Sequence, residues 1–205
     1  MKKHNFSQMN DMQFDVLKEI GNIGAGNATT ALSQLVGERI DMKTPSVQLI
    51  DIGELSDIVG GPENIIVGIL ITLSLDVEGM MMFVLEQSTA HFYVNILMGK
   101  NLDDFSEFSE MDLSVLQEIG NILSGAYLSS ISSLTNLNIN QSIPYMTIDM
   151  AGAILSVPAI EFGKIGDKAL LIQSKICEDE TEANGYFILI PKEESYSKIL
   201  SSLGM

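Results

Sequence analysis

The chain has 205 residues, of which 46% are hydrophobic and 19% charged, so the apolar content is sufficient for a packed core and excludes global disorder. It carries 27 acidic against 11 basic residues, which gives a formal net charge of −16. That charge repels phosphate backbones and anionic lipid headgroups, which argues against nucleic-acid binding and against attachment to an acidic membrane.

Cysteine and histidine usage points to a reduced, metal-free protein. Cys177 is the only cysteine, and the two histidines, His4 and His91, lie far apart in the sequence, so we expect neither a disulfide nor a zinc site. The N-terminal residues 1–15 lack the apolar run of a signal peptide. The longest apolar stretch, 65–75, is too short to cross a bilayer and is predicted to be a buried strand. The expectation is a cytoplasmic protein without membrane insertion.

The first predicted element is a helix over 12–35 with two distinct sides. Its broad, mainly apolar side is expected to hold Phe14, Leu17, Gly21, Gly24, Ala28, Ala31 and Leu35. Its opposite side carries a narrow stripe of Asp15, Glu19, Asn22 and Gly26. At helical spacing, a carboxylate and an amide therefore project from one exposed face about one turn apart.

A hairpin and a second helix complete the first half of the chain. Strands are predicted over 67–73 and 80–85 with a turn at 76–79. A helix over 88–98 follows and is expected to end at Gly99. An acidic segment rich in phenylalanine and serine then leads into the second half.

The second half begins with a helix that carries the same kind of polar stripe. This stripe comprises Ser114, Glu118, Asn121 and Gly125, and the opposite side holds Leu116, Ile119, Leu123 and Tyr127. Strands are predicted over 169–176 and 186–190, with the acidic residues and Asn184-Gly185 between them as the turn. A last helix over 193–203 is expected to end at Gly204.

The two halves match each other with an offset of 99 residues (114 − 15), and the same offset relates Pro45 to Pro144. The chain is therefore predicted to consist of two copies of about 100 residues, 1–100 and 106–205. The sheet of either copy is too small to be stable alone, because small domains bury little surface on folding. The predicted fold class is α/β (α+β): one internally duplicated, pseudo-two-fold domain in which a largely antiparallel sheet packs against long helices. Whether the halves exchange strands stays open.

Polar residues on a helix face are usually just solvated, and glycines such as Gly21 and Gly24 can simply permit close packing. Against that interpretation, both copies keep a Gly-Asn pair, although each of these residue types lowers helix propensity by about 0.5–1 kcal/mol. The glycine run 21–26 does not fit a dinucleotide-binding loop, because it lies inside a helical pattern and its counterpart, 120–125, lacks the middle glycine.

The stripes do not assemble a nucleophile or a complete metal site. Ser114 has no base near it in sequence, its counterpart is Asp15, and the second stripe holds a single carboxylate. A glutamate can dock a cation and an asparagine can orient a water. The pair can therefore complete a site whose metal, phosphoryl group and lysine are supplied by a partner protein.

Eight residues reproduce the motif of a known family. They are Asp15, Glu19, Asn22 and Pro45, and again Ser114, Glu118, Asn121 and Pro144. This doubled motif resembles that of the CheC/CheX/FliY family of chemotaxis phosphatases, and the resemblance covers essentially the whole chain.

The resemblance implies a phosphatase that acts on the aspartyl-phosphate of a CheY-type response regulator. Asn22 and Asn121 would orient the attacking water, and Glu19 and Glu118 would pair with the regulator's lysine. The resemblance implies no cofactor of the protein's own, because Mg²⁺ would be supplied by the bound regulator.

The same resemblance assigns supporting roles to four further residues. Asp15 and Ser114 would make outer contacts, while Pro45 and Pro144 would shape the loop beneath each helix. CheC-type members also bind the receptor deamidase CheD, and Asp149 is the candidate for that surface because its surroundings resemble a family segment.

Three other functions are weighed against the phosphatase. A non-enzymatic adaptor would bind the regulator or CheD without accelerating dephosphorylation. A FliY-type switch protein fits less well because an additional C-terminal domain would be expected after the last helix. A CheX-type protein is also a poorer fit, because such a protein is expected to be a shorter chain that carries one motif and forms a dimer.

Overall fold

The computed structural model describes residues 11–37, 41–162, 168–178 and 181–203. Its helices are α1 (Asp11–Val36), α2 (Leu55–Ile58), α3 (Gln87–Met98), α4 (Glu110–Thr135), α5 (Ala151–Phe162) and α6 (Glu193–Ser202), with a short 3-10 helix over Ile52–Glu54. Its strands are β1 (Asp41–Asp51), β2 (Ile65–Leu75), β3 (Gly79–Glu86), β4 (Ile139–Gln141), β5 (Tyr145–Met150), β6 (Lys168–Glu178) and β7 (Thr181–Pro191).

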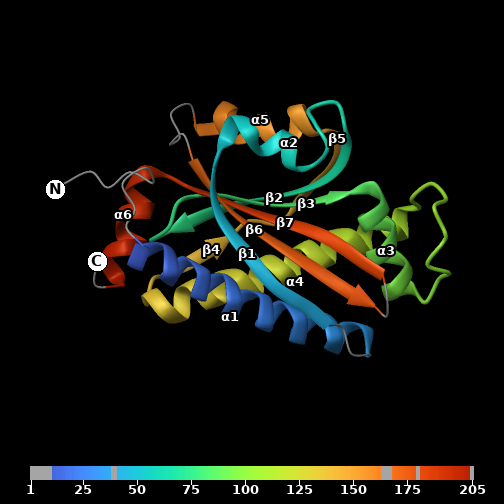
Figure 1. Cartoon of the computed structure of the whole chain (residues 1–205), viewed down its shortest axis with the longest axis horizontal. Coiled ribbons are helices and arrows are strands. Elements are labelled where there is room, and N and C mark those ends of the chain that lie inside the picture. Colours follow the sequence, from blue (N-terminus) through green and yellow to red (C-terminus); the bar gives the residue numbers. More distant parts are fainter. Residues whose placement is uncertain (1–10, 38–40, 163–167, 179–180, 204–205) are drawn as a thin grey trace.

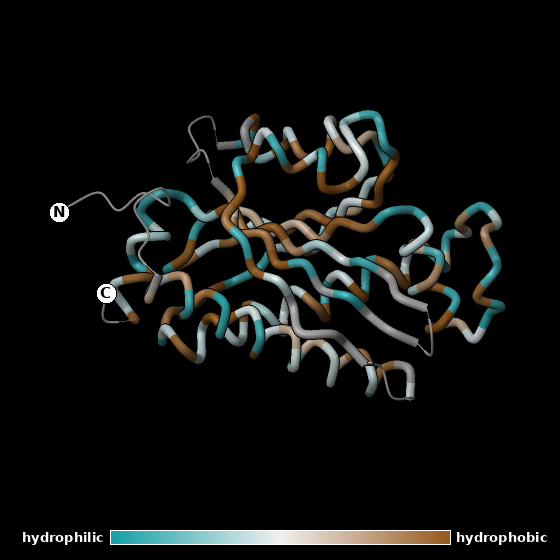
Figure 2. Tube along the Cα trace, viewed as in Figure 1, coloured by the Kyte–Doolittle hydropathy of each residue, from teal (hydrophilic) through white to brown (hydrophobic). Residues whose placement is uncertain are grey.

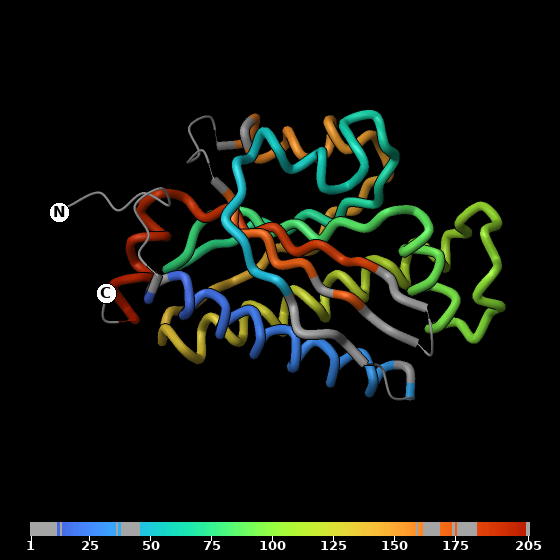
Figure 3. The backbone as a smooth tube through the Cα atoms, viewed as in Figure 1, coloured from blue at the N-terminus to red at the C-terminus, as the bar shows by residue number. Residues whose placement is uncertain are grey.

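The strands form one sheet in the order β1-β6-β7-β3-β2-β4, with β5 also paired to β2. The described pairings are antiparallel. This arrangement of long helices on a largely antiparallel sheet confirms the predicted fold class. It also answers the question of strand exchange, because β1 from the first half pairs with β6 and β5 from the second half pairs with β2. Figure 3 shows this interleaving along the chain.

Helices cover both faces of the sheet (Figure 1). The longer pair, α1 and α4, lies side by side on one face, whereas α2 and α5 lie on the other. The central strand β3 contributes to both cores, since successive side chains point to opposite faces. Met81 and Phe83 pack towards α1 and α4, while Met82 and Val84 pack towards α2 and α5. The buried central strand β3 is apolar over residues 80–85, and Figure 2 shows hydrophobic residues along the centre of the sheet.

Aromatic rings fill the core at the middle of the sheet. Phe83 and Phe187 face each other across the β3–β7 ladder with their ring centroids 4.6 Å apart. The ring of Tyr127, from α4, lies 4.3 Å from that of Phe187. The two long helices are also joined directly, because Asn27 Nδ2 donates to Ser130 Oγ at 3.0 Å.

One predicted turn is wrong. Asn184 and Gly185 lie inside β7, where they pair with Lys175 and Ser174. Gly185 is buried, and a Cβ there would lie 2.9 Å from the ring of Phe83. The glycine therefore makes room for a core aromatic ring instead of reversing the chain.

Most predicted boundaries agree with the structure. The helix expected over 12–35 spans Asp11–Val36, and the helix expected over 88–98 ends at Gly99, which has a left-handed φ of 61°. The expectation for Leu35 is wrong, because its side chain is 47% exposed near the end of α1. The last helix ends at Ser202, and Gly204 lies outside the described residues.

Candidate active site

The two motif helices present the predicted polar stripes away from the sheet. In α1 the buried side includes Leu17 and Ile20, and in α4 it includes Leu116 and Ile119. The opposite faces carry the stripe residues: Asp15, Glu19, Asn22, Ser114 and Glu118 are exposed, and Asn121 is half-buried. Because α1 and α4 lie in the same layer of the molecule (Figure 1), both stripes are exposed on that layer.

Two glycines set how closely these helices approach the sheet. A Cβ at Gly21 would lie 2.7 Å from Val47 Cγ2, and a Cβ at Gly120 would lie 2.7 Å from Ile69 Cγ2. Both distances are far below van der Waals contact, so only glycine permits this approach without displacement. Each glycine directly precedes a motif asparagine, and close packing accounts for its place in the helix.

The start of α4 is fixed by a cluster of Lys100, Ser109 and Asp112, of which only Asp112 is buried. Ser109 caps the helix in a reciprocal arrangement with Asp112, and Lys100 Nζ lies 2.6 Å from Asp112 Oδ1. The hydrogen bond from Lys100, followed by those from Ser109, holds the pKa of the Asp112 carboxyl below its usual range despite burial. This cluster anchors the helix one turn before the second motif begins.

The second motif borders an open groove of about 350 Å³. Its walls comprise Gln117, Glu118, Asn121, Gln141, Ser142, Ile143 and Pro144. One wall is the exposed side of α4, and the other is the end of β4 with the loop that leads to β5. Pro144 is buried within this loop.

Hydrogen bonds to the motif helix and to the sheet hold the groove together. Gln117 Nε2 donates to the backbone oxygen of Pro144 at 2.8 Å, and Gln141 Nε2 donates to Asn121 Oδ1 at 2.9 Å. On the sheet side, the backbone N–H of Ser142 donates to the Thr72 oxygen on β2 at 2.9 Å. The loop is thereby tied both to the motif helix and to the sheet.

The first motif lies on the exposed face of α1. Lys18 Nζ lies 3.7 Å from Asp15 Oδ1 and 4.7 Å from the centre of the Phe14 ring. Pro45 lies within β1, where the register shifts between Lys43 and Ser46, and not in a loop as the resemblance implied. A proline has no N–H for the ladder, which accounts for a shift at this point.

The motif side chains are available to a partner. Within the described ranges, no hydrogen bond or ion pair engages the carboxylates of Glu19 and Glu118 or the amide of Asn22. The described residues contain no group of three histidine, cysteine or acidic side chains able to hold a metal ion. A free carboxylate beside an amide can dock a cation and orient a water, but it cannot provide a nucleophile.

The remaining predicted residues lie apart from this groove. Asp149 is exposed on β5, where its Oδ1 accepts a hydrogen bond from the Met150 N–H at 2.7 Å. The ring of His91 stacks on Phe108 at 4.0 Å, and partial burial lowers the pKa of this histidine. His4 lies outside the described residues, as does the side chain of Cys177.

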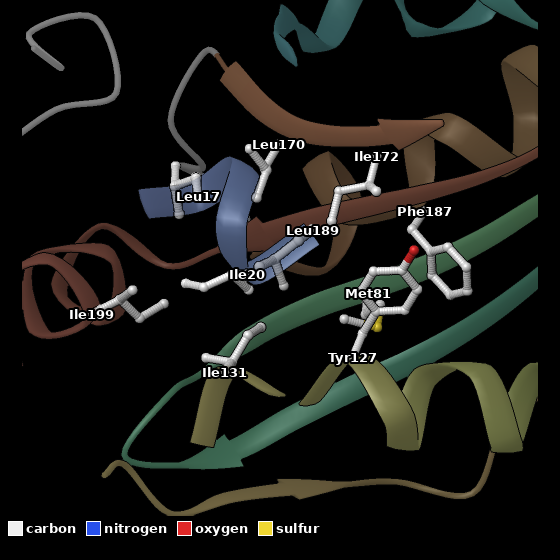
Figure 4. Close-up of a pocket in the computed structure, with 10 residues that line it drawn as sticks. All are labelled: Leu17, Ile20, Met81, Tyr127, Ile131, Leu170, Ile172, Phe187, Leu189 and Ile199. Carbon is white, nitrogen blue, oxygen red and sulfur yellow. The ribbon is translucent and has the colours of Figure 1, made fainter. Parts of the chain in front are cut away.

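An apolar cavity beneath the two helices is not a substrate site. It measures about 20 Å³ and is enclosed by side chains such as Leu17, Ile20, Tyr127 and Phe187 (Figure 4). A cavity of this size and lining has no room for a charged substrate and offers it no complementary group. No helix in the described ranges has the length and apolar character needed to cross a bilayer.

Comparison with known proteins assigns the chain to a family. The CheC-like family model matches residues 12–49 and 111–144, the two segments that contain the motif positions. The chain is 32% identical over 203 residues to the CheY-P phosphatase CheC of Bacillus subtilis (strain 168), and the alignment covers 97% of each protein.

Solved structures share the fold. Thermotoga maritima FliY matches with a TM-score of 0.76 at 20% identity, over 96% of this chain and 98% of that one. A chain of the CheX-CheY-BeF3-Mg²⁺ complex from Borrelia burgdorferi matches with a TM-score of 0.50 at 17% identity, over 82% and 95%. These two matches are distant in sequence and show the fold alone. The identity to the Bacillus protein over nearly its whole length shows that the chain belongs to the CheC-like family.

Proposed function

We propose that this protein is a phosphatase that hydrolyses the aspartyl-phosphate of a CheY-type response regulator. The observation that carries the proposal is the groove beside α4, in which the unpaired carboxylate of Glu118 and the amide of Asn121 face an open space. The family relative named as a CheY-P phosphatase supports the same reaction. The proposed substrate implies that the protein works in the cytoplasm.

The site is suited to a reaction centre held by another protein. It lies on the exposed side of a helix and offers one carboxylate and one amide. The regulator would bring the phosphoryl group, its lysine and the Mg²⁺ that neutralises the phosphoryl oxygens. Insertion of the helix face beside the aspartyl-phosphate would complete the site without any cofactor of the protein's own.

Each motif residue has a chemical task in this proposal. Asn121 would hold a water in line with the scissile P–O bond, and Asn22 would do the same at the first motif. Glu118 and Glu19 would accept hydrogen bonds from the regulator's lysine and fix the docking register. The water attacks phosphorus as the aspartate oxygen leaves, and its proton passes to the released phosphate.

The supporting residues act through position. Asp15 lies one turn before Glu19, and its Oδ1 is 3.7 Å from Lys18 Nζ. The Ser114 hydroxyl donates to the backbone oxygen of Glu110 at 3.0 Å, so this side chain is bonded to its own helix. Binding of CheD at the surface around Asp149 is a further part of the proposal, since this carboxylate is exposed and is not among the residues that line the groove.

The experiment is phosphate release from a phosphorylated CheY-type regulator in Mg²⁺. The intact protein should accelerate release, and replacing both Asn22 and Asn121 by alanine should lower the rate by about 100-fold, because water positioning is lost. Gln34→Ala removes another exposed amide of α1 and serves as the matched control. Acceleration that survives in the double variant would contradict the proposed reaction.

A further inference from the structure

Gln141 occupies an unusual place beside the second motif. It is the last residue of β4, and its backbone pairs with Leu73 of β2. From that position its side-chain Nε2 donates to Asn121 Oδ1 at 2.9 Å. The motif asparagine on the helix is thus attached to a residue anchored in the sheet.

Packing alone does not explain a glutamine at this position. Its Oε1 is buried and accepts no hydrogen bond from the residues that the structure describes. A buried acceptor without a donor costs free energy, and an apolar side chain of similar length would avoid that cost. The useful contribution of the amide is therefore its donor, which is directed at Asn121.

The bond fixes the orientation of the asparagine without blocking it. A carbonyl oxygen has two lone pairs, so Asn121 Oδ1 can accept from Gln141 and still accept from a water. With the oxygen held, the Asn121 NH2 group is left for a second contact in the groove. A side chain prepared in this way needs no reordering when substrate arrives.

We propose that Gln141 is a positioning residue for Asn121, and that it makes the second motif the more preorganised of the two. This inference rests on the proposed phosphatase function. The sequence position 99 residues earlier is Met42 in β1, and a thioether has no hydrogen to donate. Asn22 therefore cannot receive the equivalent bond from that residue.

The test uses each motif as a control for the other. Gln141→Leu is made in the Asn22→Ala background, where the second motif alone works, and in the Asn121→Ala background, where the first alone works. Phosphate release from a phosphorylated CheY-type regulator is followed over a range of regulator concentrations. In the first background kcat should fall about tenfold with KM unchanged. In the second background neither constant should change.

Two outcomes overturn the inference. Equal losses in both backgrounds would show that Gln141→Leu disturbs the fold, and an unchanged kcat in the Asn22→Ala background would show that Asn121 does not depend on Gln141.

A second readout separates this inference from the proposed function. The NMR resonances of the Asn121 side-chain amide should report an ordered group in the intact protein and a rotationally averaged one in Gln141→Leu. Identical order in both proteins would refute positioning even if the enzyme is active. Full activity in the Asn22→Ala, Asn121→Ala double variant would instead refute the phosphatase mechanism, and the NMR result would still stand.

Discussion

The close approach of α4 to the sheet predicts a stability loss when Gly120 is replaced by alanine. The new Cβ would lie 2.7 Å from both Cδ1 and Cγ2 of Ile69 and 3.3 Å from its Cβ. Ile69 is fully buried and branched at Cβ, so rotation of its side chain cannot relieve the overlap. The helix or strand must shift, and overpacking of this kind costs about 1–3 kcal/mol.

A second glycine of the same helix supplies the reference. A Cβ at Gly125 would meet nothing within 4 Å, so Gly125→Ala should gain only the helix propensity of alanine, about 0.8–1 kcal/mol. The same propensity gain applies at Gly120. The free energies of unfolding of the two variants should therefore differ by the overpacking cost alone, about 1–3 kcal/mol.

Urea unfolding followed by far-UV circular dichroism measures this difference directly, and thermal unfolding should show it as about 2–4 °C per kcal/mol for a chain of this size. Equal stability of Gly120→Ala and Gly125→Ala would refute the claim that glycine is needed for the helix to reach Ile69.

Three further changes have expected outcomes. Ser109→Ala should lower the free energy of unfolding by about 1 kcal/mol in a denaturant titration because the α4 cap is lost, whereas the exposed Ser114→Ala should change it by less than about 0.5 kcal/mol. Lys100→Met should cost about 1.5–3 kcal/mol at pH 7 because it removes the charged partner of buried Asp112. Since Lys100 lowers the folded-state pKa of Asp112, this cost should shrink as the pH falls from the ordinary range of an aspartate carboxyl through that lowered pKa, and a cost that stays constant throughout an acid titration would contradict the pairing. Glu19→Gln together with Glu118→Gln should raise the regulator concentration needed for half-maximal phosphate release about tenfold or more, because the docking carboxylates are lost, and an unchanged KM would exclude that role.

Local patterns in the sequence were sufficient to predict the helices α1, α3, α4 and α6 and the outward direction of the motifs. The 3.6-residue spacing of Leu116, Ile119 and Leu123 predicts their burial, and all three are buried. The same spacing places Glu118 and Asn121 on the opposite face, and the structure confirms this placement because both residues line the groove. Their catalytic roles stay a prediction.

Long-range features could not be predicted in this way. Asn184-Gly185 is a common turn pair, yet the packing of Gly185 against Phe83 keeps it inside a strand. The helix α5 was not predicted. Its segment is almost uniformly apolar, so it shows no helical periodicity, and it contains Pro158, which is unusual inside a helix. Pairing of β1 with β6 joins segments far apart in the chain, and no local pattern encodes it.

The partnership of Gln141 and Asn121 was missed for the same reason. The two residues come from β4 and α4, and their contact depends on how the loop after β4 returns to the helix. The only signal in the sequence was a difference between the two copies. Gln141 precedes Pro144 by the same interval by which Met42 precedes Pro45, so the second copy has a glutamine where the first has a methionine. That difference between the copies indicates unequal sites once the fold is known.

The most direct measurement determines binding and turnover in the same sample. The Asn22→Ala, Asn121→Ala double variant is titrated into a regulator labelled with a fluorophore and phosphorylated in Mg²⁺, and complex formation and phosphate release are followed together. If the asparagines orient water, the double variant should bind the regulator as the intact protein does and release phosphate about 100-fold more slowly. Loss of binding in parallel with rate, or an intact protein that binds without accelerating release, would contradict a catalytic role and favour an adaptor.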